Sequence, residues 1–358
     1  MSNSCILTSS ESNQHLLANI GFAAFYVIKP TCLIFDILGH ILCFMAYYKE
    51  SKTNGLYSFQ LYDAVAKSVD TFSAFLLLVT FKWSSGADYA GFEWFQKNYT
   101  LMWYAAHLAI AANDMTTTIK LFISLSMTTD RLISIALPTR YKQINRKLWE
   151  LGAVSFSLVI GISASLFMCF FYVVEPNGGK YKLVNDQQFR ASLTAAILVN
   201  VRNVLWMGGL VALIATGFLI VYFYHKRRVK VGEMTGAQAN DKKEKIRRKA
   251  EKTLLVLTMY HSAQAANEMT VMTVQTLLSF TNGFTTCGGK LYSPIRNIEV
   301  ALINASDFYI MVLVSSSFRQ IIKRALPFNK EQPTSMVGSV VKNGSSINVQ
   351  PSARHTEA

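Results

Sequence analysis

The chain has 358 residues, of which 51% are hydrophobic and 16% are charged, whereas a soluble domain carries about 25% charged residues. The mean hydropathy is +0.26 and the formal net charge is +14. This composition argues against a soluble enzyme, a nucleic-acid-binding protein and a disordered protein.

The hydrophobic residues fall into seven long blocks. A transmembrane helix needs about 20 mostly apolar residues, and in chain order the predicted spans are 19–47, 57–81, 101–128, 149–174, 193–224, 253–281 and 295–317. The first span is not expected to be a cleavable signal, because nothing basic precedes it and no small-residue cleavage pattern follows it. We therefore expect an all-α membrane protein, with a seven-transmembrane helix bundle over residues 19–317.

A short amphipathic helix and a polar tail are predicted after the last span. Over residues 318–328, apolar and basic residues fall on opposite helical faces, the apolar ones being Phe318, Ile321, Ile322 and Ala325 and the basic ones Arg319, Lys323 and Arg324. Such a helix suits the inner membrane surface. Residues 329–358 are polar, which predicts a disordered cytoplasmic tail, and residues 1–18 are expected to be an extracellular N-terminal segment.

Lysine and arginine residues predict the orientation in the plasma membrane. One set of connecting segments holds 23 of them and the other holds 5, the first set being 48–56, 136–150, 225–252 and 318–358 and the second 1–18, 83–100, 175–192 and 282–294. Positively charged loops stay in the cytoplasm, so the N-terminus is expected outside and the C-terminus inside. The basic stretch from Lys226 to Lys252 is interpreted as a topology signal and a solvated extension of the adjacent helices, and it could also dock a cytoplasmic partner. Much of the positive net charge then sets the orientation and attracts anionic membrane lipid, and no nucleic-acid partner is expected.

A longer motif directly follows the third predicted span. The sequence TTDRLISIALPTRY matches D-R-x-x-x-I-x-x-P-x-x-Y through Asp130, Arg131, Ile135, Pro138 and Tyr141. Here the chain resembles the rhodopsin-like (class A) G-protein-coupled receptors, in a divergent form of invertebrate neuropeptide or chemosensory type. The acidic residue of the second span, the seven spans and the amphipathic helix extend the resemblance over roughly residues 19–326.

The resemblance implies a switch at the cytoplasmic end of the third helix. Asp130 would restrain Arg131 at rest, and Arg131 would meet a heterotrimeric G protein when the helices move apart, because a guanidinium can exchange one polar partner for another. The alternative is a juxtamembrane basic residue with an ordinary acidic neighbour. The expected ligand is an extracellular small molecule or short peptide, because the short N-terminal segment leaves no room for a ligand-capturing domain.

Several features of the family pattern are missing. Ala106 replaces the cysteine at the start of the third helix, no proline lies in the predicted spans 4 to 7, and TMYHSAQAANEM replaces the usual C-W-x-P region. The N-P-x-x-Y pattern of the seventh helix becomes Asp307-Phe308-Tyr309-Ile310-Met311. Cys5 and Cys287 are the two cysteines in expected extracellular segments, and we predict that they form a disulfide, with two free thiols as the alternative.

Ionisable residues within the spans are expected to form a cluster, because a charge in hydrocarbon is costly and usually functional. Lys120, Asp70 and Asp307 lie at a similar depth at about 1.5 Å per helical residue. Lys120 could neutralise both acids and replace the sodium ion that the resemblance implies at this place. Alternatively, Lys67 pairs with Asp63 or Asp70, and Lys120 pairs with Asp307 alone or turns outward. The full predicted cluster comprises His40, Asp70, Lys120, Asn304 and Asp307.

A ligand site is expected in the outer half of the bundle, since a cavity between helices is the default site in such a fold. The candidate contacts are polar residues of the outer helices, namely Asn113, Asp114, Arg202, Gln264, Asn267, Glu268, Arg296 and Glu299. Their mixed charges suit a zwitterionic or peptide ligand. The alternative is an internal salt bridge, such as Arg202 with Glu268, that only closes the bundle.

Other ligands and activities have little support in the sequence. The span 295–317 contains no lysine, so retinal has no anchor there, and neither a cofactor nor a metal is expected. An ion-coupled transporter or channel that uses the charge cluster is the alternative function, although no internal repeat supports it. A membrane enzyme lacks both a metal-binding pattern and a nucleophile motif. Asn98 lies in a glycosylation sequon on an expected outer loop, whereas the sequons at Asn304 and Asn343 should stay unmodified.

Overall fold

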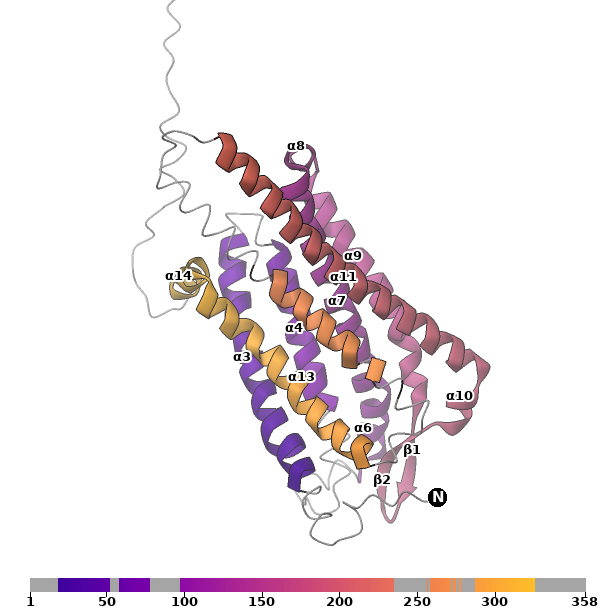
Figure 1. Cartoon of the computed structure of the whole chain (residues 1–358). Helices are drawn as coiled ribbons and strands as arrows, with labels where there is room; N and C mark the ends of the chain where they lie inside the picture. Colours follow the sequence, from indigo (N-terminus) through magenta and orange to yellow (C-terminus); the bar gives the residue numbers. More distant parts are fainter. Residues whose placement is uncertain are drawn as a thin grey trace, which may run out of the picture. The chain divides into compact units, whose positions relative to one another are not determined.

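The computed structural model of this chain separates two units, Met1–Ala325 and Leu326–Ala358. The structure describes residues of the first unit only, namely 19–51, 58–77, 97–234, 256, 258–271, 273–274, 277 and 287–325. The predicted N-terminal segment and cytoplasmic tail lie outside these residues. The described chain is mostly helical, as expected from the sequence, and it also contains one β-hairpin (Figure 1).

The first described helix has an irregular turn next to a proline. The π-helical turn η1 (Ala23–Ile28) runs directly into α3 (Lys29–Ser51). Pro30 has no amide hydrogen and cannot donate the ordinary i→i−4 bond, which accounts for the wider turn on its N-terminal side. α3 then packs along α4 (Ser58–Leu77), and both helices contain buried polar residues.

The helix α7 (Ile110–Ala136) continues from α6 (Tyr99–Tyr104) and the π-helical η5 (Ala105–Ala109). α7 packs against α4, α9 and α11. A Cβ atom on Gly161 of α9 would overlap the Ile119 side chain of α7. The close approach of these two helices therefore depends on glycine.

The chain turns through the short helix α8 (Pro138–Tyr141) into α9 (Arg146–Ser165) and the 3-10 turn η6 (Leu166–Phe171). The Asn145 side chain accepts a hydrogen bond from the backbone N–H of Leu148 and so caps the first turn of α9. α9 thus begins close to the predicted start of the fourth span.

A β-hairpin that the sequence analysis did not predict follows η6. β1 (Tyr172–Asn177) pairs antiparallel with β2 (Lys180–Asn185), and Gly178 and Gly179 join them with φ angles of +57° and +79°. Two successive positive φ angles form a tight hairpin turn that glycine adopts without steric cost. The fourth predicted span therefore ends too late, because its last residues belong to a strand.

The fifth helix is longer than predicted. After α10 (Gln187–Ala191), α11 runs from Leu193 to Met234, whereas the predicted span ends at residue 224. The basic stretch after that span thus begins as an extension of the helix, as expected. Residues 258–271 of the sixth predicted span are helical as well.

The seventh helix also differs from its prediction. α13 (Cys287–Val314) begins before the predicted residue 295, so the seventh helix does contain a proline, Pro294, although the predicted span 295–317 contains none. α14 (Ser316–Ala325) follows, two residues earlier than expected, because Ser315 Oγ accepts a hydrogen bond from the backbone N–H of Phe318 at 3.0 Å.

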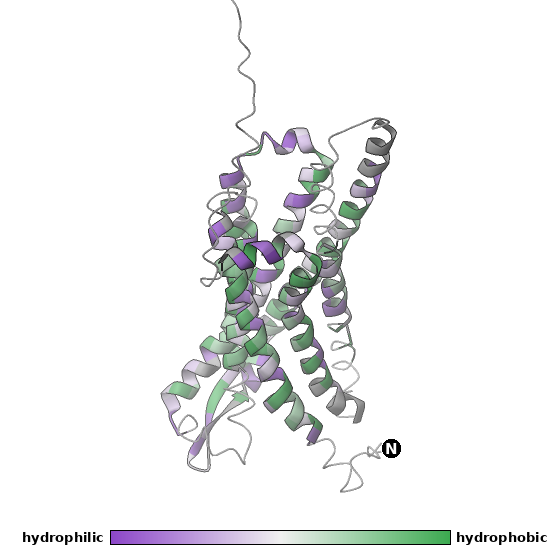
Figure 2. Ribbon diagram, turned by 90° about the vertical axis from the view of Figure 1, so that its left-hand side faces the viewer, coloured by the Kyte–Doolittle hydropathy of each residue, from purple (hydrophilic) through white to green (hydrophobic). Residues whose placement is uncertain are grey.

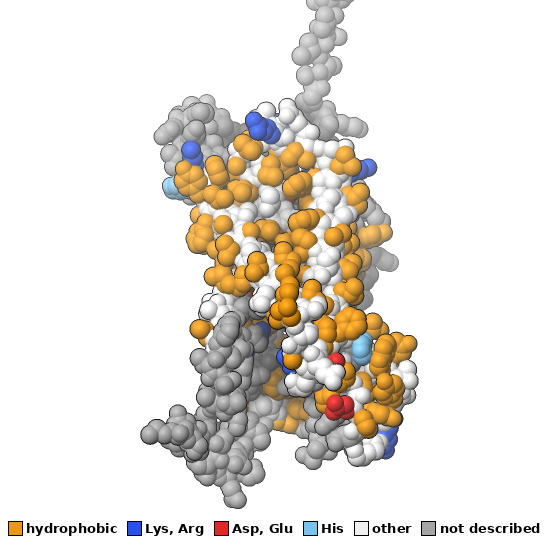
Figure 3. All heavy atoms as spheres, turned by 90° about the vertical axis from the view of Figure 1, so that its right-hand side faces the viewer, with side chains coloured by type: hydrophobic (Ala, Val, Ile, Leu, Met, Phe, Trp, Pro, Cys, Tyr) orange, Lys and Arg blue, Asp and Glu red, His pale blue; other side chains and the backbone are white. Residues whose placement is uncertain are grey.

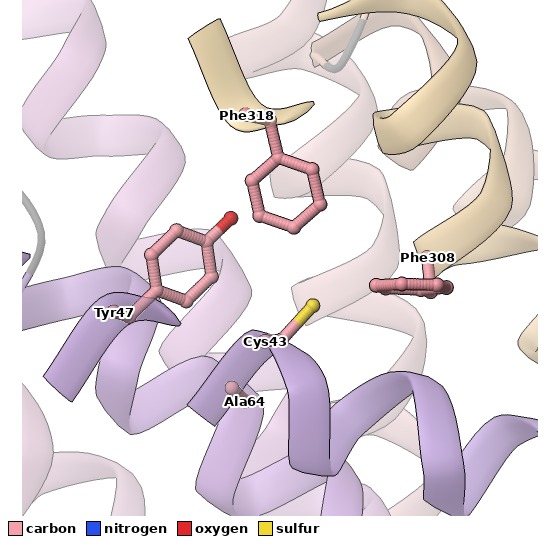
Figure 4. Packing of buried hydrophobic residues seen from close by; sticks show 5 residues of the cluster. All are labelled: Cys43, Tyr47, Ala64, Phe308 and Phe318. Atoms are coloured by element: carbon pink, nitrogen blue, oxygen red, sulfur yellow. The ribbon is translucent and has the colours of Figure 1, made fainter. Parts of the chain in front are cut away.

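The amphipathic helix α14 is fixed to the first helix by a small aromatic core. Phe318 packs against Tyr47 of α3 and Phe308 of α13, with ring centroids 5.6 and 6.1 Å apart, and Cys43 and Ala64 complete the cluster (Figure 4). The basic residues Arg319 and Lys323 are exposed on the other side of α14. The structure therefore supports the predicted division into an apolar and a basic face.

Among the described residues, three helices are long and apolar enough to cross a membrane: Asn19–Lys49, Arg146–Phe171 and Leu193–Lys226. Their outer faces are apolar, with Val159 of α9 64% exposed and Phe218 of α11 71% exposed. Hydrophobic residues are frequent along the helices (Figure 2), and on the face drawn in Figure 3 hydrophobic side chains are spread over the coloured surface, with few charged ones. α4 and α7 are not apolar enough to be included among these three helices, because charged and polar residues lower their mean hydropathy.

Candidate functional site

The central ion pair joins Asp70 of α4 to Lys120 of α7. Lys120 Nζ lies 2.7 Å from Asp70 Oδ2, and both side chains are largely buried. The other carboxylate oxygen, Oδ1, accepts hydrogen bonds from Thr117 Oγ1 at 2.5 Å and Thr116 Oγ1 at 3.2 Å. The predicted contact between Lys120 and Asp70 is therefore present, and the alternative in which Lys120 turns outward is wrong. The Asp307 side chain lies outside the described side chains.

A second pair lies one to two turns along α4. Lys67 Nζ is 3.0 Å from Asp63 Oδ2, and Ser124 Oγ of α7 donates to Asp63 Oδ1 at 2.9 Å. Of the two acids with which Lys67 could pair by its spacing, Asp63 and Asp70, the structure places it against Asp63. The two predicted pairings of α4 are therefore present together, because each lysine binds a different aspartate.

A third pair, in the first helix, includes a residue that the sequence analysis missed. His40 Nε2 lies 2.8 Å from Asp36 Oδ1, and Thr71 Oγ1 of α4 donates to Asp36 Oδ2 at 2.7 Å. Asp36 is only 2% exposed. Its position four residues before His40 places both side chains on one helix face, and this spacing was the signal available in the sequence.

Members of all three pairs line one cavity between the helices, namely Asp36 and His40, Asp70 and Lys120, and Lys67 of the second pair. The cavity has a volume of about 50 Å³, and one water molecule occupies about 10–15 Å³ on that measure, so several would fit. Its polar lining consists of Asp36, His40, Lys67, Asp70, Thr71, Thr117, Lys120, Ser124, His261, Gln264, Glu268 and Asn304. Glu268 also attracts Lys120 electrostatically. Among the described residues, no group of three or more His, Cys, Asp or Glu side chains is arranged to hold a metal ion.

The outer polar residues are connected mainly by a pair between α7 and α11. Arg202 Nε donates to Asp114 Oδ2 at 2.7 Å, and Arg202 Nη2 donates to the other carboxylate oxygen. The guanidinium also lies 5.6 Å from the ring centroid of Trp206, whose Nε1 donates to Thr118 Oγ1 at 2.8 Å. Arg202 therefore pairs with Asp114, and the predicted example of a closing bridge to Glu268 names the wrong acid.

The remaining candidate ligand contacts are partly buried. Arg296 of α13 lies within electrostatic range of Glu268 of the sixth helix and of Glu299 on its own helix. Asn113 contributes its backbone carbonyl to Thr117, and Asn267 is partly buried without a role that the structure reveals. Among the described outer residues, Arg202 and Asp114 thus form a direct ion pair, and Arg296 has acidic side chains within electrostatic range.

Helices 6 and 7 are connected by a tyrosine that the sequence analysis did not select. Tyr260 Oη lies 2.5 Å from Ser306 Oγ and donates to the Ile303 carbonyl at 3.0 Å, and Gln264 Nε2 donates to Tyr260 Oη at 3.1 Å. A tyrosine within an apolar helix generally needs such a partner. Tyr260 lies in the region where the family's usual switch motif is missing.

At the end of α7, Asp130 was expected to restrain Arg131, but its hydrogen-bond partner in the structure is Tyr141. Tyr141 Oη donates to Asp130 at 3.2 Å from Oδ1 and 3.1 Å from Oδ2, and Pro138 starts the helix that presents Tyr141. Burial raises the pKa of Tyr141, and the Asp130 charge raises it further, so this hydroxyl stays protonated and can donate. Arg131 is buried, and its electrostatic partners include Tyr47, Asp63 and Asp130. Ile135 is partly buried one turn later.

The other predicted sites fall at the margins of the described chain. The predicted disulfide cannot be followed, because Cys5 and the Cys287 side chain lie outside the described part. Within that part, Cys32, Cys43 and Cys169 are not joined in disulfides. Asn98 is exposed, and its side-chain oxygen accepts a hydrogen bond from the backbone N–H of Leu101 at the start of α6. In comparisons with known proteins, neither a family model nor a curated sequence matches this chain.

Proposed function

We propose that this chain is a rhodopsin-like G-protein-coupled receptor that transmits the binding of an extracellular small ligand or short peptide to a heterotrimeric G protein. The observation that carries the proposal is the motif at the end of α7, where Asp130 is bound by Tyr141 and Arg131 is buried. A buried guanidinium at a helix end can change partners when neighbouring helices separate.

The proposed receptor crosses the plasma membrane seven times, with its N-terminus outside. Three helices support this by their length and apolar character. α4 and α7 are proposed to cross beside them, because their ionisable side chains pair internally, as is usual for charges at membrane depth. The amphipathic face of α14 supports a position along the inner membrane surface.

α7 would connect the two ends of the receptor. It carries Asp114 at one end, Lys120 in the middle and Arg131 at the other end. A ligand that competes for Asp114 or Arg202 would change how α7 packs against α11, and it would act as an agonist if it binds the active arrangement more tightly. The mixed charges at this end favour a ligand that itself carries both signs.

A ligand-library screen with a promiscuous G-protein reporter tests the proposal. Cells that express the chain should respond to at least one ligand, and Arg131→Ala should abolish the response at equal surface expression. Arg140→Ala is the matched control, because Arg140 is an exposed arginine on α8, and its response should be retained. An Arg131→Ala variant that responds like the wild type would contradict the proposed coupling.

An ion-coupled transporter or channel is the second candidate. It is favoured by the cavity between the helices, which is lined by the pairs Asp36–His40 and Asp70–Lys120 and by Lys67. In that case, ion currents or substrate uptake would persist in cells that lack G-protein activity, and Lys120→Met would reduce them. Currents or uptake without any G-protein response would therefore favour the second candidate.

A further inference from the structure

Asp63 is a buried carboxylate that lies outside the recognised motif. It is 8% exposed, and it accepts contacts from Lys67 Nζ at 3.0 Å and Ser124 Oγ at 2.9 Å. It also interacts electrostatically with His261 of the sixth helix. Asp63 of α4 is thus a point at which α4, α7 and the sixth helix meet.

Arg131 is placed to reach this point. Arg131 follows Ser124 by seven residues, so the two lie on the same face of α7 about 10 Å apart along the axis. Long side chains on a helix point back toward its N-terminus, and this direction would carry the Arg131 guanidinium toward Ser124 and Asp63. Asp63 is accordingly one of its electrostatic partners.

Asp130 faces another part of the chain. Adjacent residues on a helix do not face each other, and both carboxylate oxygens of Asp130 accept hydrogen bonds from Tyr141 of α8. Asp130 therefore holds the short helix α8 against the end of α7. Asp63, by contrast, accepts a hydrogen bond from Ser124, which lies on the same face of α7 as Arg131.

We propose that Asp63 is the counter-charge that positions Arg131 in the resting receptor, and that Asp130 fixes α8 through Tyr141. The proposal rests on the receptor function proposed above. On activation, α7 and the sixth helix would move relative to α4, so Arg131 would leave Asp63 and become accessible to the G protein. Lys67 shares Asp63 with Arg131 and so weakens this restraint.

Basal G-protein signalling tests the restraint without a known ligand. At equal surface expression, Asp63→Asn should raise the basal reporter signal at least about fivefold, the lower end of typical coupling effects. Lys67→Gln should lower the basal signal, because Asp63 is then free to bind Arg131 alone. If Asp63 only neutralised Lys67, both variants would raise the signal, and this result would overturn the proposal. Ser124→Ala removes one hydrogen bond to Asp63 and should raise the basal signal by a smaller factor. This variant replaces Asp63→Asn in the test if Asp63→Asn does not reach the cell surface.

A thermal double-mutant cycle on the full chain in detergent tests the contact independently of signalling. Asp63→Asn should lower the melting temperature less in an Arg131→Gln background than in the wild type, because the partner is already lost. Strictly additive losses would overturn the contact. Thermal coupling in a chain for which no variant activates a G protein would support the contact and overturn the receptor function.

Discussion

The Lys120–Asp70 pair illustrates how this chain keeps charges inside an apolar environment. Both carboxylate oxygens of Asp70 have a partner on α7, and the only cation among these partners is Lys120. Breaking a buried pair leaves an uncompensated charge, whereas replacing both partners is often tolerated. The pair is therefore expected to behave as a unit in mutagenesis.

Lys120→Met should lower the free energy of unfolding by about 3–5 kcal/mol, because Asp70 then remains buried without its cation. The double variant Asp70→Asn/Lys120→Met should recover most of this loss. Melting temperatures of the detergent-solubilised chain measure both effects. Equal losses in the single and double variants would show that the pair does not govern the stability of this region.

The site shows which residue-level features a sequence discloses. The similar depth of Lys120 and Asp70 followed from counting helical residues. The spacing along α4 allowed Lys67 to pair with Asp63 or Asp70, and it did not decide between the two acids. The roles of Thr71, Ser124 and Tyr260 depend on which helix faces which, and helix spacing does not contain that information. Asp36 could have been selected from its spacing to His40.

The elements differ from their predictions mainly at boundaries. Hydropathy locates apolar segments but does not distinguish a helix from a short strand, so Val173 and Val174 were assigned to the fourth helix. The Asn-Gly-Gly sequence that closes the hairpin was a turn signal of the kind that fixes such boundaries. The end of α11 and the start of α13 moved because polar residues can continue a helix beyond an apolar span.

The contact between α9 and α7 provides a test at the scale of elements. Gly161→Ala should destabilise the chain by about 1–3 kcal/mol, because the new methyl group would overlap Ile119 and approach the Met115 carbonyl, 3.2 Å away. Gly152→Ala, in the same helix, meets nothing within 4 Å and should be neutral or stabilising by up to about 1 kcal/mol. Thermal denaturation of the two variants side by side measures the difference, and equal stabilities would show that α9 can shift away from α7.

At the scale of the whole molecule, the proposed orientation predicts where carbohydrate is attached. Asn98 is exposed at the start of α6 and should carry an N-linked glycan in a eukaryotic host, because that loop is proposed to face the lumen during synthesis. A glycosidase should increase the gel mobility of the wild type and leave Asn98→Gln unchanged. Asn304→Gln, within α13, should behave as the wild type. A glycan at Asn343 would show that the C-terminal tail faces the lumen, and this would contradict the proposed orientation.

The 42-residue length of α11 has a geometric consequence. At 1.5 Å per residue, this helix measures about 63 Å, roughly twice the 30 Å thickness of a hydrocarbon layer. If α11 spans that layer as proposed, about half of it stands in the headgroup region and in water. A rotation of a few degrees within the lipid would then be amplified into a sweep of several ångströms at the protruding tip.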